Sequence, residues 1–424
     1  MKTLILALAG YILAPLALRA ESVEIIASAD TTLREEQPAT NYGAVSELRA
    51  GAVDGGPQRR TLLRFDIGAA VPAGATITAA RLTLEALDAP EEGAAPHEFE
   101  IRRVRNFWNE GTGEGGDILP GEASWQSRAH PQARWTRPGG ARAFDFAAVP
   151  SAMATVGAAG ARTFGSTPGL VSDVQHWLDN PQRNEGWMLT QAPGAGAGGV
   201  RVFAAREDGA RAPRLTVDFT PAPADLAPSA EYDVVFRATW SASTHPRDFP
   251  PGAHWSGLVG GLHAPSVSFW GRGATATRGI QGVAELGSKI VLLDEVNAAT
   301  AAGTANRTLS GGSINGGTGT VTLRFAVDRS HPLVTLTAMI APSPDWFVGV
   351  RGLPLIEQGR WVPRKTVMLF PYDAGTDSGA TFRSPDFVTD PRGVISRIIT
   401  RPLAVRGRAA PMGTFTFIRV APAP

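Results

Sequence analysis

Three aspartates in the second half of the chain are the residues best placed to form a functional site. Asp345 lies in the segment IAPSPDWFVGV, and Asp373 and Asp377 lie in LFPYDAGTDSGATF, with Asp373 28 residues after Asp345. Ca²⁺ takes six to eight oxygen ligands in irregular geometry, so carboxylates from separate loops suit it. Gly375 permits a sharp turn that would direct the two flanking carboxylates to one side. Three carboxylates held together without a cation repel one another, so an ion would order these loops.

Two other interpretations of the aspartates remain open at the level of the residues. Aspartate and glycine are common turn formers, and on the residues alone this explanation is the better one. Carboxylates beside a histidine can also activate water, and four histidines lie in the same half: His245, His254, His263 and His331. Each stands beside apolar or turn residues, and no Ser-His-Asp arrangement or HExxH motif stands out. We therefore expect a protein that is not an enzyme.

Composition restricts the class of protein and of metal site. The chain has 424 residues, enough for two or three domains, and its formal net charge of +1 would not attract nucleic acid or anionic lipid. It contains no cysteine, which excludes disulfides and zinc–thiolate sites and favours oxygen ligands. The basic residues are almost all arginine, and alanine, glycine and proline are abundant. This usage is typical of GC-rich bacterial coding sequences.

The first twenty residues have the layout of a secretory signal peptide. MKTLILALAGYILAPLALRA combines a basic start, an apolar run and a small residue, Ala20, so cleavage before Glu21 is expected. The alternative is an uncleaved membrane anchor, but Pro15 interrupts the run, which is shorter than the ~20 residues that span a bilayer. No later segment is apolar for long enough to span one. We expect a secreted chain without an integral membrane segment once the signal is removed.

The loops that carry the aspartates are predicted to connect β-strands. Leu63, Phe65 and Ile67 alternate with polar residues, as do the apolar residues of 321–327, and such period-2 runs indicate half-buried antiparallel strands. The Pro/Ala-rich residues 221–230 read as a short stiff linker between a domain at 21–220 and one at 231–424. The chain is therefore expected to be all-β, with two β-sandwich or jelly-roll domains.

Two segments depart from the strand pattern. After Pro168, the apolar residues of LVSDVQHWLDN share one face of a helix, which is the one helix that the sequence indicates. The glycine-rich segment GGSINGGTG (311–319) is interpreted as a hairpin or a mobile loop. Its glycines are not spaced like those of a phosphate-binding loop.

The second half resembles a known family in four stretches. YDVVFRATWSASTHPRDFP, HWSGLVGGLH, HPLVTLTAMIAPSPDWFVGV and YDAGTDSGATFRSP are similar to the N-terminal domain of spondins, found in animal matrix proteins and in bacterial exported proteins. The resemblance runs from about Glu231 to the strand GTFTFIRVA near the end of the chain. It implies a C2-like β-sandwich that binds Ca²⁺ in loops at one end.

Carried over to this chain, the family's metal ligands are Asp345, Asp373 and Asp377. The oxygen chemistry of these loops agrees with that assignment. Animal spondin domains also carry disulfide cysteines, which this chain lacks. We therefore expect its stability to depend more on packing and on the metal.

The first half resembles DNRLRE domains, extracellular modules related to carbohydrate-binding modules. The similar stretches include ADTTLREEQPATNYGAVSELRAG, RRTLLRFDI, FWNEGTGEGGDILPGEASW and RAPRLTVDF. Modules of this kind stack aromatic faces on sugar rings, and Trp108, Trp125 and Trp135, in a glycine-rich region, are the candidate sugar-binding residues. Packing within a long loop is the other role open to them, and the one that the sequence favours. Trp177 and Trp187 are expected in the core.

Together these features predict a non-catalytic, secreted, Ca²⁺-binding protein that acts in adhesion, in an extracellular matrix or biofilm, or in glycan recognition. Its partner would be an extracellular polysaccharide or a surface or matrix protein, and not a nucleic acid. The alternative is an accessory or catalytic component of extracellular polysaccharide degradation.

Overall fold

The computed structural model describes residues 20–52, 56–87, 95–131, 133–194, 199–223, 226–405 and 408–420. The predicted signal peptide lies outside these ranges except for Ala20, and two residues of the predicted linker lie outside them as well. Strands make up 42% of the structure and helices 11%, which confirms the all-β class. In the described ranges no helix has both the length and the apolar character needed to cross a bilayer.

Ten strands before residue 221 form one continuous sheet that closes on itself. They are β1 (Glu21–Arg34), β2 (Glu47–Ala52), β3 (Gln58–Phe65), β4 (Thr76–Ala86), β5 (His97–Arg103), β8 (Ala152–Val156), β9 (Gly160–Phe164), β10 (Trp187–Gln191), β11 (Arg201–Ala204) and β12 (Arg214–Thr220). The first part of β1 pairs with β12 and its second part with β3, with a bulge between Ala27 and Ala29. A bulge bends a strand, so β1 passes from one layer of the sandwich to the other.

Alternation along the strands builds the core of this first sandwich. In β12, Leu215, Val217 and Phe219 are buried while the residues between them are only partly covered. Helix α2 (Pro168–Asp179) covers one end of the core, and its N-cap Thr167 accepts a hydrogen bond from the Leu170 amide at 3.1 Å. The predicted helix is therefore confirmed. The short α1 (Ile67–Ala70) packs beside it.

The second half contains two facing sheets. One has the order β17-β13-β27-β22, and the other has the order β16-β15-β18-β19-β23-β24, with β14 beside β18. The bounds are β13 (Ser229–Thr239), β14 (His254–Trp255), β15 (Val259–His263), β16 (Ala305–Ser310), β17 (Thr318–Asp328), β18 (Leu333–Ala341), β19 (Trp346–Pro354), β22 (Arg364–Leu369), β23 (Tyr372–Asp373), β24 (Ser396–Arg397) and β27 (Gly413–Arg419). Apolar residues of both sheets fill the space between them.

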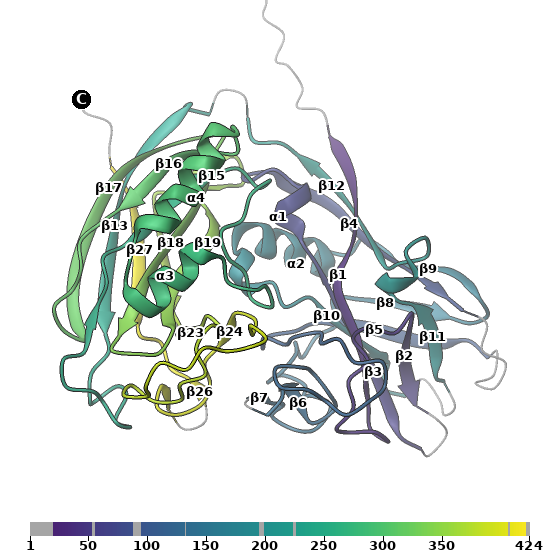
Figure 1. Ribbon diagram of the computed structural model, residues 1–424. Helices are drawn as coiled ribbons and strands as arrows, with labels where there is room; N and C mark the ends of the chain where they lie inside the picture. Colours follow the sequence, from purple (N-terminus) through teal and green to yellow (C-terminus); the bar gives the residue numbers. More distant parts are fainter. Residues whose placement is uncertain are drawn as a thin grey trace, which may run out of the picture.

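The sequence did not predict the two helices of the second half. α3 (Arg278–Leu286) and α4 (Ile290–Ala301) lie across the outer face of the larger sheet, over β15, β16, β18 and β19 (Figure 1). Ile280, Val283, Leu292 and Val296 pack there in a second apolar cluster with Phe347. Every residue of β18 is buried because this sheet is covered on both faces.

The glycine-rich segment is not a hairpin. Residues 311–317 join β16 of the larger sheet to β17 of the smaller one, so the segment crosses from one layer to the other. Ile314 forms an isolated bridge with Trp255, and the Trp255 indole donates to the Gly317 carbonyl at 3.1 Å. A hairpin would have required both flanking strands in one sheet.

Polar and apolar contacts join the two sandwiches along one interface, which we call the seam. The Arg272 guanidinium contacts Glu185 at 2.6 Å, and Lys365 Nζ donates to the Asp179 carbonyl at 2.5 Å. Ile399 of the second sandwich packs in an apolar cluster with Phe107, Ala129 and Ala133 of the first. The seam therefore fixes the two sandwiches against each other.

Candidate metal centre in the second sandwich

The three predicted aspartates lie at one end of the larger sheet. Asp345 directly precedes β19, and Asp373 ends β23, which pairs with β19 so that Asp373 is opposite Trp346. The Ala374 amide donates to the Asp345 carbonyl at 3.1 Å, and Asp377 follows in the loop. Gly375 has φ +73°, a left-handed conformation, as the turn-forming role predicted for it requires. A Cβ there would meet the Gly393 backbone at 2.6 Å, so the position also needs glycine for space.

Asp345 is the central side chain of this group. It is fully buried, and its Oδ2 accepts hydrogen bonds from the amides of Thr376 at 2.7 Å and Asp377 at 3.1 Å. The Thr376 hydroxyl donates to the same oxygen at 3.2 Å. The other oxygen, Oδ1, is buried and has no hydrogen-bond partner in the described part of the chain. A buried carboxylate oxygen without a partner is costly, and a cation would satisfy it.

The other two carboxylates are held by backbone amides of their own loops. Asp373 Oδ1 accepts from the Gly375 amide at 2.8 Å. Asp377 Oδ1 accepts from Gly379 at 2.7 Å, and its Oδ2 accepts from Phe387 at 2.9 Å. Sequence reasoning did not include the segment around Phe387 in the site, and nothing in its composition marks it. A carboxylate oxygen has two lone pairs, so these contacts leave capacity for a metal.

Burial and mutual repulsion shape the protonation of the group. Burial raises the pKa of Asp345. Burial, followed by the nearby charge of Asp345, raises the pKa of Asp373 to about 7. The three aspartates thus lie near enough to influence one another, as the sequence led us to expect. A bound divalent cation would remove this repulsion and favour the ionised forms.

The three carboxylates are hard oxygen ligands of the kind that Ca²⁺ takes, so they fit a hard cation. Among the described residues, however, no three His, Asp or Glu side chains already form a preassembled metal site. Side-chain adjustments at Asp373 and Asp377 would accompany binding. Within the described ranges, none of the four histidines hydrogen-bonds to these aspartates: His263, for example, contacts the Ala264 carbonyl at 2.9 Å and the Thr335 hydroxyl at 2.8 Å.

The three candidate sugar-binding tryptophans lie inside the first sandwich. Trp108, Trp125 and Trp135 expose 0%, 5% and 4% of their surface and pack in one apolar cluster. The Trp108 indole donates to the Glu185 carbonyl at 2.8 Å, and that of Trp135 to the Ser124 carbonyl at 2.9 Å. A sugar ring needs an exposed aromatic face, which none of the three offers, so the sugar-stacking interpretation is corrected to packing.

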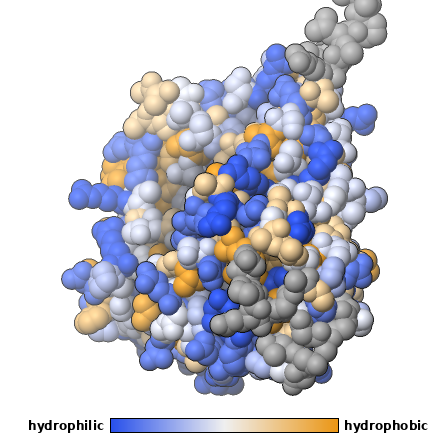
Figure 2. Space-filling model, turned by 90° about the vertical axis from the view of Figure 1, so that its right-hand side faces the viewer, coloured by the Kyte–Doolittle hydropathy of each residue, from blue (hydrophilic) through white to orange (hydrophobic). Residues whose placement is uncertain are grey.

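Among the described residues of the first sandwich, Phe144 does expose an aromatic ring, at 65% of its surface. Figure 2 shows one face of the molecule. On that face hydrophilic residues predominate, and apolar residues form small separate groups among the coloured atoms. Trp177 and Trp187 are buried against each other, with ring centroids 4.5 Å apart, in agreement with the core position predicted for them.

Comparison with known families agrees with this two-part organisation. Residues 230–406 match the family model described as Spondin_N. The second sandwich is a Spondin_N domain. Residues 21–113 match the model of carbohydrate-binding module family 96, so this part of the first half is carbohydrate-binding-module-like, as its resemblance implied. The later strands of that half belong to the same sheet.

Curated relatives match through the Spondin_N domain. The chain is 38% identical to human Spondin-2 over 173 residues, covering 40% of this chain and 52% of that protein. It is 36% identical to rat Spondin-1 over 171 residues, covering 39% of this chain and 21% of that protein. The chain thus spans about half the length of Spondin-2 and about a fifth of Spondin-1.

Proposed function

We propose that this chain is an exported, non-catalytic recognition protein whose Spondin_N domain binds Ca²⁺ through Asp345, Asp373 and Asp377. The observation that carries the metal assignment is the buried, unpartnered Oδ1 of Asp345, next to two further carboxylates. Ca²⁺ bound there would neutralise the group and brace the loops that follow β23. No other described part of the domain combines an unpartnered carboxylate oxygen with two neighbouring acidic side chains.

The recognition role rests on the pairing of the two domains. The Spondin_N and carbohydrate-binding-module families are generally non-catalytic. An extracellular polysaccharide, or a surface or matrix protein, is the partner that this pairing and the expected signal peptide favour. Adhesion, in a matrix or biofilm, is the process in which such a protein would act. Retention on an immobilised polysaccharide without release of reducing ends would support this role, whereas turnover would favour the degradative alternative.

The metal site is tested by thermal unfolding in Ca²⁺ and in chelator. Extracellular modules bind Ca²⁺ at about 10⁻⁴–10⁻³ M. Ca²⁺ at about 10 mM, tenfold to a hundredfold above such a dissociation constant, should add about 1.4–2.7 kcal/mol to the free energy of unfolding. Asp377→Asn should abolish the difference between the two conditions.

Asp386→Asn is the matched control, because Asp386 is exposed in the loop that contains Phe387. It should keep the full response to Ca²⁺. Equal melting curves for the wild type in Ca²⁺ and in chelator would contradict the metal assignment without bearing on glycan retention.

A further inference from the structure

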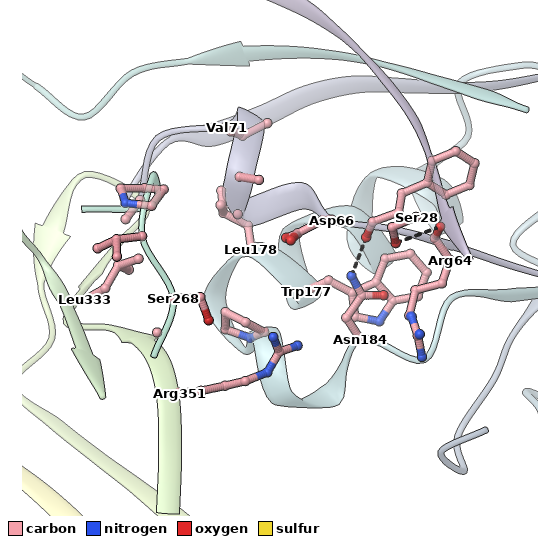
Figure 3. Close-up of a pocket in the computed structure, with 18 of the residues that line it drawn as sticks. Ser28, Arg64, Asp66, Val71, Trp177, Leu178, Asn184, Ser268, Leu333 and Arg351 are labelled. Carbon is pink, nitrogen blue, oxygen red and sulfur yellow. Dashed lines mark hydrogen bonds between the residues drawn. The ribbon is translucent and has the colours of Figure 1, made fainter. Parts of the chain in front are cut away.

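A cavity of about 230 Å³ lies in the seam between the two sandwiches. Its wall from the first sandwich comes from β3, α1 and α2, and includes Arg64 and Trp177. Its wall from the second comes from the segment that follows β15 and from β19, and includes Arg272 and Arg351. Figure 3 shows Arg351 reaching from the second sandwich toward Trp177 of the first. The cavity is separate from the aspartates described above, none of which lines it.

Positive charge exceeds negative charge around this cavity. Arg64, Arg272 and Arg351 all line it. Among the described residues, the carboxylates that act on them are Glu185, Asp66 and, for Arg64, Glu110, which is itself paired with Arg206. Glu185 is already paired with Arg272 at 2.6 Å, and Asp66 lies on the exposed rim. Burial, together with the nearby charges of Arg272 and Arg351, lowers the pKa of Arg64 to about 10. Three guanidinium groups brought this close favour the entry of an anion.

The wall also presents hydrogen-bond donors that have no acceptor. Trp177 is 1% exposed, and its indole Nε1 has no hydrogen-bond partner. Arg272 Nη1 is buried without a partner as well. Arg351 makes no hydrogen bond and no ion pair within the described ranges. The buried donors of Trp177 and Arg272 are of a kind that is rare unless something absent from the protein satisfies it, whereas Arg351 is half-buried.

The carboxylate of Asp66 lines the cavity but is exposed, and among the described residues the buried acceptor nearby that has no partner is Oε2 of Glu185. It could satisfy the free nitrogen of Arg272 after a small rotation, but it cannot also serve Trp177 and Arg351. An indole is a donor only, and a guanidinium is a donor only. A cation or an apolar group would leave both unsatisfied, so the missing partner is an acceptor.

We propose that this seam cavity binds a small oxyanion, namely a carboxylate, sulfate or phosphate group on a ligand no larger than a monosaccharide. The planar guanidinium of Arg351 can donate hydrogen bonds to two oxygens of such a group, and the Trp177 indole can donate a third hydrogen bond to it. Because the walls come from both sandwiches, the bound anion bridges them. The proposal rests neither on Ca²⁺ binding nor on polysaccharide binding.

The test is titration of the full chain, with ¹⁵N-labelled tryptophan, by sulfate, inorganic phosphate, D-glucuronate and D-glucose in low-chloride buffer. A Trp177 indole resonance, assigned by its loss in Trp177→Phe, should shift saturably with at least one of the three anions and not with glucose. The most effective anion tells which group the site prefers. Arg351→Gln should weaken that binding at least about tenfold, as loss of a hydrogen bond from a charged donor does.

Two further variants distinguish loss of the positive charge at Arg351 from a general loss of structure. Arg307→Gln, at an exposed arginine on β16, should bind as the wild type does. Arg351→Lys should retain part of the affinity because it keeps the charge. Absence of a saturable shift in the wild type at millimolar anion means that water fills the cavity and overturns the proposal, whatever the variants do. Equal affinity in Arg351→Gln and the wild type overturns it as well.

Discussion

Breaking the buried ion pair between Glu185 and Arg272 should destabilise the whole chain. The Arg272 Nη2–Glu185 Oε1 distance is 2.6 Å, and the two side chains expose 7% and 6% of their surface. Glu185→Gln keeps the volume and removes the charge, which leaves the Arg272 guanidinium buried beside Arg64 and Arg351. Removal of one partner of such a pair costs about 3–5 kcal/mol, so we expect a loss of that size.

Removing both charges should cost far less. Only one nitrogen–oxygen contact joins the pair, because Arg272 Nη1 and Glu185 Oε2 have no partner. The free-energy cost of removing two charges from water is thus offset by a single strong hydrogen bond. Replacement of both by apolar residues of similar size, Glu185→Leu with Arg272→Met, should be neutral or stabilising by about 1–4 kcal/mol.

Urea unfolding followed by tryptophan fluorescence measures these differences as shifts in midpoint. The surface pair Arg81–Asp218 is the matched control, since its 2.8 Å contact is similar but its side chains are 43% and 27% exposed. Asp218→Asn should cost below about 1 kcal/mol. If Glu185→Gln costs no more than this control, or if the double replacement is as damaging as the single one, the reasoning about the seam is refuted.

Two further predictions concern the first sandwich. Burial raises the pKa of Asp30 from 3.8 to about 8. Between these pH values the folded chain therefore holds a proton that the unfolded chain has released. The free energy of unfolding should fall as pH rises from about 4 to about 8. Asp30→Asn should flatten this part of the pH profile in thermal unfolding, and an unchanged slope would contradict the assignment. Gly186→Ala would place a Cβ 1.8 Å from the Leu63 carbonyl oxygen at φ +68°, and should cost more than about 3 kcal/mol. Gly194→Ala, at φ +80° with open space around it, should cost only about 1 kcal/mol, and similar losses in the two variants would show that the contact does not matter.

The parts of the fold predicted from the sequence are those set by local patterns. Period-2 alternation predicted the strands, and the apolar face after Pro168 predicted α2. The helix α3 was missed although its N-cap Thr277 and its terminal Gly287 are both visible in the sequence. Gly279 and Gly282 inside it weaken the helical pattern, and contact with the covered sheet compensates for their low propensity.

The candidate sites also divide into features that the sequence reveals and features that depend on tertiary packing. The three aspartates were found because a family resemblance marked them, whereas the unpartnered oxygen of Asp345 depends on the tertiary packing of the loop. The buried position of Trp108, Trp125 and Trp135 also depends on packing, because a glycine-rich loop looks the same in sequence whether it is exposed or folded over a core. The seam cavity gathers arginines from positions 64, 272 and 351, so no window of sequence could reveal it.

The seam has a consequence for how this chain can change over evolutionary time. Lys365 of the Spondin_N domain contacts the main-chain carbonyl of Asp179 in the other domain. The buried Arg272–Glu185 pair requires a matching side chain from each domain, so neither member of that pair is free to vary alone. A Spondin_N domain transferred from another protein would lack the matching residues, and one cut from this chain would expose a lysine and an arginine that are buried here. Substitutions at Glu185 and Arg272 should therefore occur together among descendants of this two-domain arrangement, and should be uncorrelated where the domain occurs by itself.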